Sequence, residues 1–262
     1  MKQSAFSLVE LSIVLVILGL LVGGILAGQS LIRAAELRAV YTDLSKYATA
    51  HYAFRDKYFA IPGDMKNAVA VWGAADGGTG ESAACATVDS RSLANPKQTC
   101  NGDGNGRIEN ITQSNEVYRY WHHLSNAGLF EGSFTGIAGP TSGGNPGYNL
   151  PTSRMSLLAI GSGWWPAGDA SGTHSGSTYE FDGYYGNIYT VQGKRDDSLA
   201  PPQARVMRPE EMWNIDTKMD DGKPAIGKFR ARKGYGCTIN DATTPEYALS
   251  VKEVLCNGVF QL

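Results

Sequence analysis

The most constraining feature of this sequence is a long apolar stretch close to its beginning. Between Phe6 and Gly28 the only charged side chain is that of Glu10. A run of about 23 residues is long enough to cross a lipid bilayer as one helix. The stretch therefore predicts a single membrane-spanning helix, with the remainder of the chain on one side of the membrane.

Two general explanations of this stretch leave part of it unexplained. A cleaved secretory signal peptide has a shorter apolar core and a small-x-small cleavage site, whereas Ile25 and Leu26 occupy the nearest candidate sites here. A plain signal anchor explains the length but not Glu10. A carboxylate inside a membrane is energetically costly, and such residues usually have a function.

The residues around Glu10 resemble the prepilin-type cleavage and methylation motif of type IV pilins and type II secretion pseudopilins. The resemblance lies in Lys2, in the segment A-F-S-L-V-E from Ala5 to Glu10, and in the apolar helix that follows. It implies that prepilin peptidase removes residues 1–5 as a leader, cuts between Ala5 and Phe6, and N-methylates Phe6. The family usually has Gly before the cut, so Ala5 is a departure that predicts slower processing.

The same resemblance gives Glu10 a role in assembly. The new amine of Phe6 and the carboxylate of Glu10 are opposite charges in one low-dielectric layer, where each alone is costly and together they neutralise each other. In the family this Glu is thought to meet the amine of a neighbouring subunit. Such a pair would set the axial register of a filament.

The helix is expected to continue well beyond the apolar stretch. No Pro or Gly occurs between Gly28 and Pro62. Apolar and aromatic residues recur there at steps of three and four, as on one face of an amphipathic helix: Leu37, Val40, Leu44, Tyr47, His51, Phe54 and Tyr58. We therefore predict one helix over about 6–60. Residues 6–28 form its transmembrane and assembly half, and 29–60 its amphipathic half.

Small residues interrupt the apolar half of this helix: Gly19, Gly23, Gly24 and Gly28. Two roles remain open for them. Gly weakens a helix by up to about 1 kcal/mol, which would permit the local melting known in the family on assembly. Alternatively, small residues allow close packing between helices. His51 lies on the amphipathic face and is expected at the edge of a core.

The four cysteines form two local couples in the expected head, residues 61–262: Cys85 with Cys100, and Cys237 with Cys256. An even number of cysteines in an exported domain predicts disulfides. A zinc site is the alternative, but the chain has no C-x-x-C and the spacings do not match zinc ligands. The second couple also fits the C-terminal disulfide loop common in type IV pilins.

The segment after Cys100 resembles the first half of an EF-hand-like calcium loop. Oxygen-bearing side chains stand at its first, third and fifth positions, with Gly106 at the sixth. The candidate calcium residues are Asn101, Asp103, Asn105, Arg107 and Glu109. Asn replaces the usual Asp at the first position and Thr112 the usual Glu at the twelfth, for which Glu109 or Glu116 could substitute. A turn cluster that binds no ion is the alternative.

Other elements of the head are predicted from turns and periodicity. Asp64 is expected to cap a short helix that ends before Gly73. Two further helices are expected at 115–127 and from Pro209 to Gly222. Strands are expected at 155–160, at 178–182 and 185–192 as a hairpin or two adjacent strands, and at 225–233 and 247–255. His122 and His123 are interpreted as surface or packing residues. Trp164 and Trp165 are interpreted either as core residues or as an exposed contact surface. The acidic group Asp216, Asp220 and Asp221 is interpreted as a solvated helix end.

The resemblance implies an α+β, pilin-like fold, in which the long helix packs on an antiparallel sheet of the head. The implied function is a structural subunit of a type IV pilus-like filament: a pilin, minor pilin or type II secretion pseudopilin. A mature chain of about 257 residues (262 minus 5) is large for a major subunit and favours a minor one. The alternative is a membrane-anchored surface-binding or adhesion protein that never polymerises, for which the candidate calcium loop would make binding calcium-dependent.

The remaining composition excludes other function classes. A net charge of -2 gives no indication of a nucleic-acid partner. The chain lacks the G-x-S-x-G, Walker, H-E-x-x-H and C-x-x-C motifs, and Ser175 beside His174 is only a sequence neighbour, so we predict no enzyme. The expected partners are other filament subunits, prepilin peptidase, the inner-membrane assembly platform and membrane lipid. The expected location is the bacterial inner membrane before assembly, with the head in the periplasm and the filament in the periplasm or at the cell surface. No cofactor is required beyond a possible calcium ion.

Overall fold

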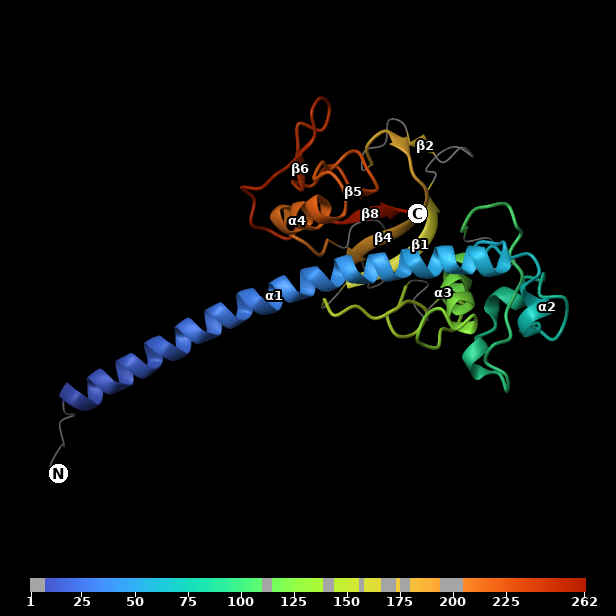
Figure 1. Ribbon diagram of the computed structural model, residues 1–262, viewed down its shortest axis with the longest axis horizontal. Coiled ribbons are helices and arrows are strands. Elements are labelled where there is room, and N and C mark those ends of the chain that lie inside the picture. The colour runs from blue at the N-terminus through green and yellow to red at the C-terminus, as the bar shows by residue number, and fades with distance from the viewer. Residues whose placement is uncertain are drawn as a thin grey trace.

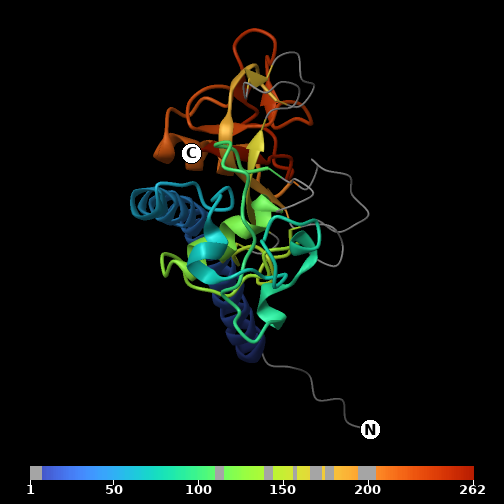
Figure 2. The same cartoon turned by 90° about the vertical axis from the view of Figure 1, so that its right-hand side faces the viewer.

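The protein consists of a long helix that carries a mixed α/β head (Figure 1). The computed structural model describes residues 8–109, 115–138, 144–155, 158–165, 173–174, 180–193 and 205–262. The C-terminal half of the helix lies along the head, and its N-terminal half projects away from it (Figures 1 and 2). The predicted α+β class, with an antiparallel sheet in the head, is confirmed.

Helix α1 (Leu8–Tyr58) has 51 residues and would be about 75 Å long at 1.5 Å per residue. Its buried residues are Val40, Leu44, Tyr47, Ala50, His51 and Phe54. All of these except Ala50 belong to the predicted amphipathic face, which is thereby confirmed. Phe59 ends the helix in the left-handed region at φ 53, a conformation that a residue with a Cβ adopts only at a cost.

The main sheet has four antiparallel strands in the order β1-β4-β8-β5. They are β1 (Leu158–Trp165), β4 (Gly186–Gly193), β8 (Gly258–Gln261) and β5 (Phe229–Ala231). The register places Ile160 opposite Val191, and Tyr189 opposite Phe260. Two small antiparallel pairs flank this sheet: β2 (Thr173–His174) with β3 (Gly183–Tyr184), and β6 (Thr238–Ile239) with β7 (Glu246–Tyr247).

Short helices complete the head. They are α2 (Ala68–Trp72), α3 (Glu116–Asn126) and α4 (Pro209–Met219), with 3-10 turns η1 (Cys85–Thr87) and η2 (Ser90–Ser92). The helices predicted at 115–127 and after Pro209 are confirmed. Pro209 occupies the first turn of α4, where its missing N–H has no helical acceptor.

An aromatic core joins α1 to α3 and the sheet. The ring of Tyr47 on α1 lies edge-on to Trp121 of α3, with centroids 5.1 Å apart, and edge-on to Tyr189 of β4 at 6.0 Å. Such edge-to-face pairs add to the free energy gained by burial. Behind them, His51 Nδ1 lies 3.1 Å from the Tyr120 hydroxyl, which lies 2.5 Å from that of Tyr189. His51 is thus fully inside the core rather than at its edge.

Both expected cysteine pairs are joined in the structure. Cys85 and Cys100 have Cα atoms 5.9 Å apart, and Cys237 and Cys256 have Cα atoms 5.0 Å apart. The first disulfide fixes the long segment between α2 and α3, which contains only the two 3-10 turns in its described part. The disulfide restricts the conformations of a segment that has little regular secondary structure of its own.

Several predicted elements of the head are wrong. The hairpin of 178–182 with 185–192 is not seen among the described residues: 178 and 179 lie outside them, 180–182 belong to no strand, and β4 pairs with β1 and β8. The strand expected at 247–255 is absent from that fully described segment beyond Tyr247, and the final strand is β8. The strand predicted at 155–160 begins at Leu158 and runs to Trp165. The side chains of Trp164 and Trp165, and all of Ser175, lie outside the described residues.

His122 and His123 are packing residues rather than surface residues. Both are buried, and they approach the same hydroxyl: His122 Nδ1 lies 3.3 Å and His123 Nε2 2.9 Å from Thr99 Oγ1. His123 Nδ1 also accepts a hydrogen bond from the Gly63 N–H at 3.0 Å. Burial lowers the pKa of His122 to about 4 and that of His123 well below its usual range, so both are neutral.

Candidate functional site

The N-terminal half of α1 exposes its apolar side chains on all sides. Leu8 is 86% exposed, Leu20 72% and Leu31 71%, and no residue before Val40 in the described part of α1 is buried. Among the described residues, α1 is the one helix that is long and apolar enough to cross a membrane. A water-exposed surface of this kind is unfavourable, so the segment needs a membrane or other protein around it.

Glu10 lies in the first turn of α1, on its exposed surface. Ala5 and Phe6, the predicted processing residues, lie outside the described residues. The four glycines of this half have nothing within 4 Å of the position that a Cβ would take. They therefore serve no packing inside the described chain, and both roles proposed for them concern other molecules or a change in the helix.

A bidentate ion pair attaches α1 to the head just beyond the apolar half. Arg33 Nε lies 2.6 Å from Glu211 Oε1, and Arg33 Nη2 lies 2.8 Å from Glu211 Oε2. Burial would raise the pKa of Glu211, but hydrogen bonds from Arg33 and from the Arg208 N–H lower it below its usual range. Glu211 therefore stays ionised, and it joins α1 to the first turn of α4.

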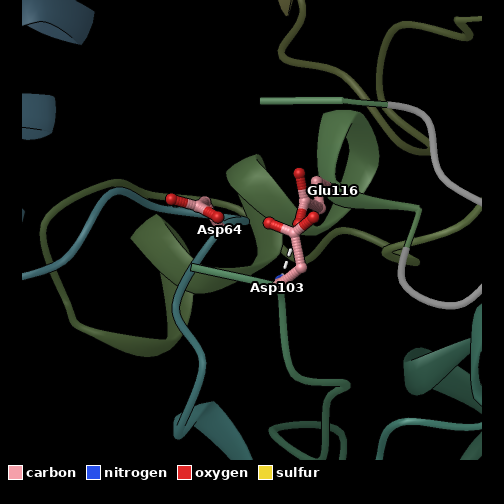
Figure 3. Close-up of side chains that lie close together, drawn as sticks. All are labelled: Asp64, Asp103 and Glu116. Carbon is pink, nitrogen blue, oxygen red and sulfur yellow. Dashed lines mark hydrogen bonds between the residues drawn. The ribbon is translucent and has the colours of Figure 1, made fainter. Parts of the chain in front are cut away.

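A second candidate site lies at the far end of α1, where three carboxylates converge (Figure 3). One oxygen each from Asp64, Asp103 and Glu116 lies within 4.8 Å of the others. Asp64 comes from the turn after α1, Asp103 from the glycine-rich loop, and Glu116 from the first turn of α3. Carboxylate oxygens are among the ligands that a hard cation such as Ca²⁺ takes.

Backbone hydrogen bonds fix these carboxylates in position. Glu116 accepts from the N–H groups of Asp103 at 3.0 Å and Glu109 at 2.9 Å. Asp64 accepts from the N–H groups of Asn105 at 3.0 Å and Gly106 at 2.9 Å. The predicted helix cap at Asp64 is therefore wrong: α2 begins at Ala68, and the Asp64 carboxylate binds the loop instead.

Two close backbone approaches make the convergence possible. A Cβ at Gly102 would lie 2.4 Å from the backbone of Asp64, and one at Gly63, where φ is +85, would lie 2.5 Å from the carbonyl oxygen of Glu116. Only glycine fits such contacts. From the other side, Asn187 of β4 holds the loop by accepting from the Ile108 N–H at 2.9 Å and donating to the Gly106 carbonyl at 2.9 Å.

The electrostatics of this site favour a positive partner. Burial raises the pKa of Glu116 to about 7, with further increases from the neighbouring Asp64 and Asp103 carboxylates. Burial likewise raises the pKa of Asp64 to about 6. Carboxylates that are buried together in this way are costly to ionise, and a bound cation would reverse that cost.

Among the predicted calcium residues, the structure brings Asp103, Asn105 and Glu109 together. The Asn105 amide donates to Asp103 Oδ2 at 2.8 Å and to Glu109 Oε2 at 3.0 Å. Arg107 Nη1 lies 3.8 Å from Glu109 Oε1. Asn101 differs, because its side-chain oxygen accepts from the Val69 N–H at 3.0 Å and so faces α2.

Sequence reasoning weighed Glu116 only as a substitute ligand and did not place Asp64 in the site. No local pattern links Asp64 to the loop, since almost forty residues separate it from Asp103. The signals that could have found it are Gly63 and Gly102, which mark close backbone approaches. A second acidic group, Asp216 with Asp220 and Asp221, lies at the end of α4, but Asp216 is buried and accepts from the Tyr247 hydroxyl at 2.7 Å. That group is therefore not simply a solvated helix end.

Comparison with known proteins identifies the N-terminal segment. Residues 1–26 match the family described as the prokaryotic N-terminal methylation motif. No curated protein and no solved structure matches the chain. The match covers Lys2, Ala5, Phe6 and Glu10 together with most of the exposed apolar half of α1. The chain therefore carries the prepilin-type motif of type IV pilins and pseudopilins, and this motif, together with the exposed apolar helix, supports a membrane-anchored precursor of the pilin-like kind.

Proposed function

We propose that the protein is a structural subunit of a type IV pilus-like filament, assembled through the N-terminal half of α1. The observation that carries this proposal is the coincidence of the methylation motif with a helix that is apolar on every side and has no covering inside the described chain. A subunit leaving the membrane must exchange lipid for protein around this surface. The same helix of neighbouring subunits can replace the lipid by packing against this surface.

Processing creates the positively charged amine with which the Glu10 carboxylate can pair. Prepilin peptidase hydrolyses the peptide bond between Ala5 and Phe6, which releases residues 1–5 and leaves an amine on Phe6. N-methylation of that amine keeps its positive charge. Glu10 then neutralises an amine at the same depth of the apolar layer, either in its own chain or in a neighbour, and the second case fixes the register between subunits.

The size of the head favours the role of a minor subunit or of a specialised large subunit. It holds about 200 residues (61–262), including α4 and two small strand pairs beside the main sheet. Its partners in this proposal are other filament subunits, prepilin peptidase and an assembly platform in the inner membrane, with the head in the periplasm. Proteins with this motif are structural subunits, and we propose no catalytic role.

Intact-mass analysis of purified filaments tests the processing step. The expected mass is that of residues 6–262 plus one CH₂ for the methyl group that replaces an amine hydrogen, less four hydrogens for the two disulfides. A functional protein that retains Met1 through Ala5 would contradict the proposal.

Substitution of Glu10 tests the assembly step. Glu10→Leu is expected to abolish filaments while leaving the protein in the membrane, where the variant is better tolerated than the wild type. Ser12→Leu is the matched control, since it adds the same leucine side chain two residues away and keeps the carboxylate. Filaments that persist with Glu10→Leu would favour the alternative of a surface-binding protein that does not polymerise.

We also propose that the carboxylates of Asp64, Asp103 and Glu116 hold a calcium ion that stabilises the head. Support comes from their convergence within 4.8 Å, from the glycine-rich loop that carries Asp103, and from the raised pKa values of two of the three. Extracellular calcium is abundant enough for a weak site to be filled.

Thermal unfolding of the full chain with calcium and with a chelator tests this site. At a calcium concentration of 100 times the Kd, binding to the folded state alone would stabilise it by about 2.7 kcal/mol. Asp103→Asn, which keeps the hydrogen-bonding shape, is expected to lose this increase in Tm. Asp221→Asn in the second acidic group is the control and should retain it. An equal response of the wild type to calcium and to chelator would refute the site.

A further inference from the structure

A groove lies between α1 and the beginning of α4, at the level where the exposed apolar half of α1 ends. Its volume is about 820 Å³. One wall is a single face of α1 from Leu26 to Leu37, since the residues that line it recur every three or four positions. The other wall is the segment from Arg205 into α4, and Val254 of the loop before β8 also lines the groove.

The position of the groove along α1 places it at a membrane surface. From Phe6 to Gly28 a helix rises roughly 34 Å, slightly more than the ~30 Å hydrocarbon core of a bilayer. A span that begins near Phe6 therefore leaves the hydrocarbon close to Leu26, where the groove starts. The groove thus opens into the layer that phospholipid headgroups occupy.

The charges in the groove are not balanced. Its two carboxylates are each engaged in an ion pair: Glu211 with Arg33 at 2.6 Å, and Glu210 with Lys252 at 3.1 Å. Arg205 and Arg208 form no ion pair with any described residue. Two cationic side chains are therefore available to a ligand at this level.

Arg205 is held in place and has a hydrogen-bond donor to spare. Its guanidinium lies over the ring of Tyr235, 3.9 Å from the centroid. Its Nε–H is buried and has no acceptor among the described residues. A buried donor without an acceptor is unfavourable, so a ligand oxygen at this point would relieve a cost already present in the folded head.

The apolar side chains of the groove join the lipid-facing surface of α1, beside the polar side chains of Gln29, Ser30 and Asn214. Leu26, which is 62% exposed, and Val254, which is 46% exposed, both line it. Leu37 and Val206 line it as well. A fitting ligand therefore combines an anionic group for the two arginines with hydrocarbon that continues along α1 into the bilayer.

We propose that this groove binds the headgroup of an anionic phospholipid of the membrane that α1 spans. The phosphate is bound by Arg205 and Arg208, and the acyl chains follow the exposed face of α1 from Leu26 toward Glu10. The site holds the head against the membrane before assembly. The inference rests on membrane insertion of α1, which the proposed function shares, and does not depend on polymerisation.

Native mass spectrometry of the full-length protein tests this site. The protein in detergent is offered phosphatidylglycerol or phosphatidylcholine at equal concentration, and the ratio of lipid-bound to free protein is measured. The wild type is expected to bind the anionic lipid about tenfold better, given the attraction of two cations to one anionic headgroup. Arg205→Gln with Arg208→Gln is expected to reduce this preference to near unity.

Matched variants separate a site from general charge. Lys218→Gln with Lys223→Gln removes the same two positive charges from exposed positions in the last turn of α4 and just beyond its end, and should keep the preference. Val254→Glu places a carboxylate in the groove without changing either arginine and should lose it. This variant serves as the test if the double arginine variant does not fold.

Three results would overturn the proposal: equal binding of both lipids by the wild type, an unchanged preference in the folded arginine variant, or an equal loss in the lysine variant. A complex that contains a second copy of the chain in place of lipid would also overturn it. Glu10→Leu distinguishes the two proposals, because it should abolish filaments and leave the lipid preference unchanged.

Discussion

The two halves of α1 both carry large apolar side chains, but these have opposite surroundings: the N-terminal half is apolar on every side and uncovered, whereas the amphipathic C-terminal half packs its apolar face on the head. Residues such as Leu18 and Leu20 are 51% and 72% exposed, whereas Leu44 and Phe54 are completely buried against the head. The C-terminal half is therefore stabilised by its own chain, and the N-terminal half must obtain its partners from outside. Stability of the head and assembly of the protein should then respond to different substitutions in the same helix.

The largest difference in stability is expected between a truncation in the buried half of α1 and one in its exposed half. Phe54→Ala should lower the free energy of unfolding of the head by about 3–5 kcal/mol, because it leaves a cavity beneath α3. Leu18→Ala should leave it unchanged within about 0.5 kcal/mol. Denaturant unfolding followed by tryptophan fluorescence is suitable, since all five tryptophans lie beyond residue 60. Equal effects of the two variants would contradict the division of the helix.

Removal of the first disulfide should have the next largest effect. Cys85→Ala with Cys100→Ala is expected to destabilise the head by about 3 kcal/mol, the value for a closed loop of this length. The bond closes a separation of 15 residues in a segment without long helices or strands. The same unfolding experiment measures the change, and the membrane-bound fraction, which depends on the other half of α1, should stay constant.

A smaller effect is expected at the boundary between the two halves. Glu211→Ala removes the ion pair with Arg33 and the hydrogen bond from the Arg208 N–H, and should cost about 1–2 kcal/mol. Glu36→Ala is the control, because its pair with Arg33 is one of a partly exposed i,i+3 type and is worth about 0.2–0.5 kcal/mol. A similar loss in both variants would show that Arg33 does not act through Glu211.

The smallest expected effect is a pH dependence that belongs to the head alone. Burial raises the pKa of Asp216 to about 7, with further contributions from Asp221 and Asp220, so the folded state favours the protonated form. The associated stability is fully present below the usual pKa near 3.8 and is lost as the pH rises through about 7. Asp216→Asn should remove this dependence between pH 4 and pH 8. An identical profile for wild type and variant would contradict this assignment.

The elements that could be predicted from the sequence are those whose signal is local. The amphipathic face through Leu44 and Tyr47, the helix that starts at Pro209 and the processing motif each depend on spacings within a few turns. The two disulfides could be expected from proximity along the chain. In these cases the residues that determine the structure are also neighbours in sequence.

The elements that could not be predicted depend on contacts between distant segments. Strand β4 pairs with β1 and β8 rather than with its immediate predecessor, and no turn residue encodes that choice. Asp64 reads locally as a helix cap, yet its carboxylate binds the N–H groups of Asn105 and Gly106. The sequence therefore predicted only part of the candidate cation site, because Asp64 reaches it through tertiary structure.

The attachment of Arg33 to Glu211 has a mechanical consequence. From this residue onward α1 is tied to the head, first by the ion pair and then by the core residues from Val40 to Phe54. Any change in the angle between head and membrane must therefore take place before Arg33, in the stretch that holds Gly19, Gly23, Gly24 and Gly28. A force applied to the N-terminus would bend or extend this stretch first, and the head would follow together with the C-terminal half of α1.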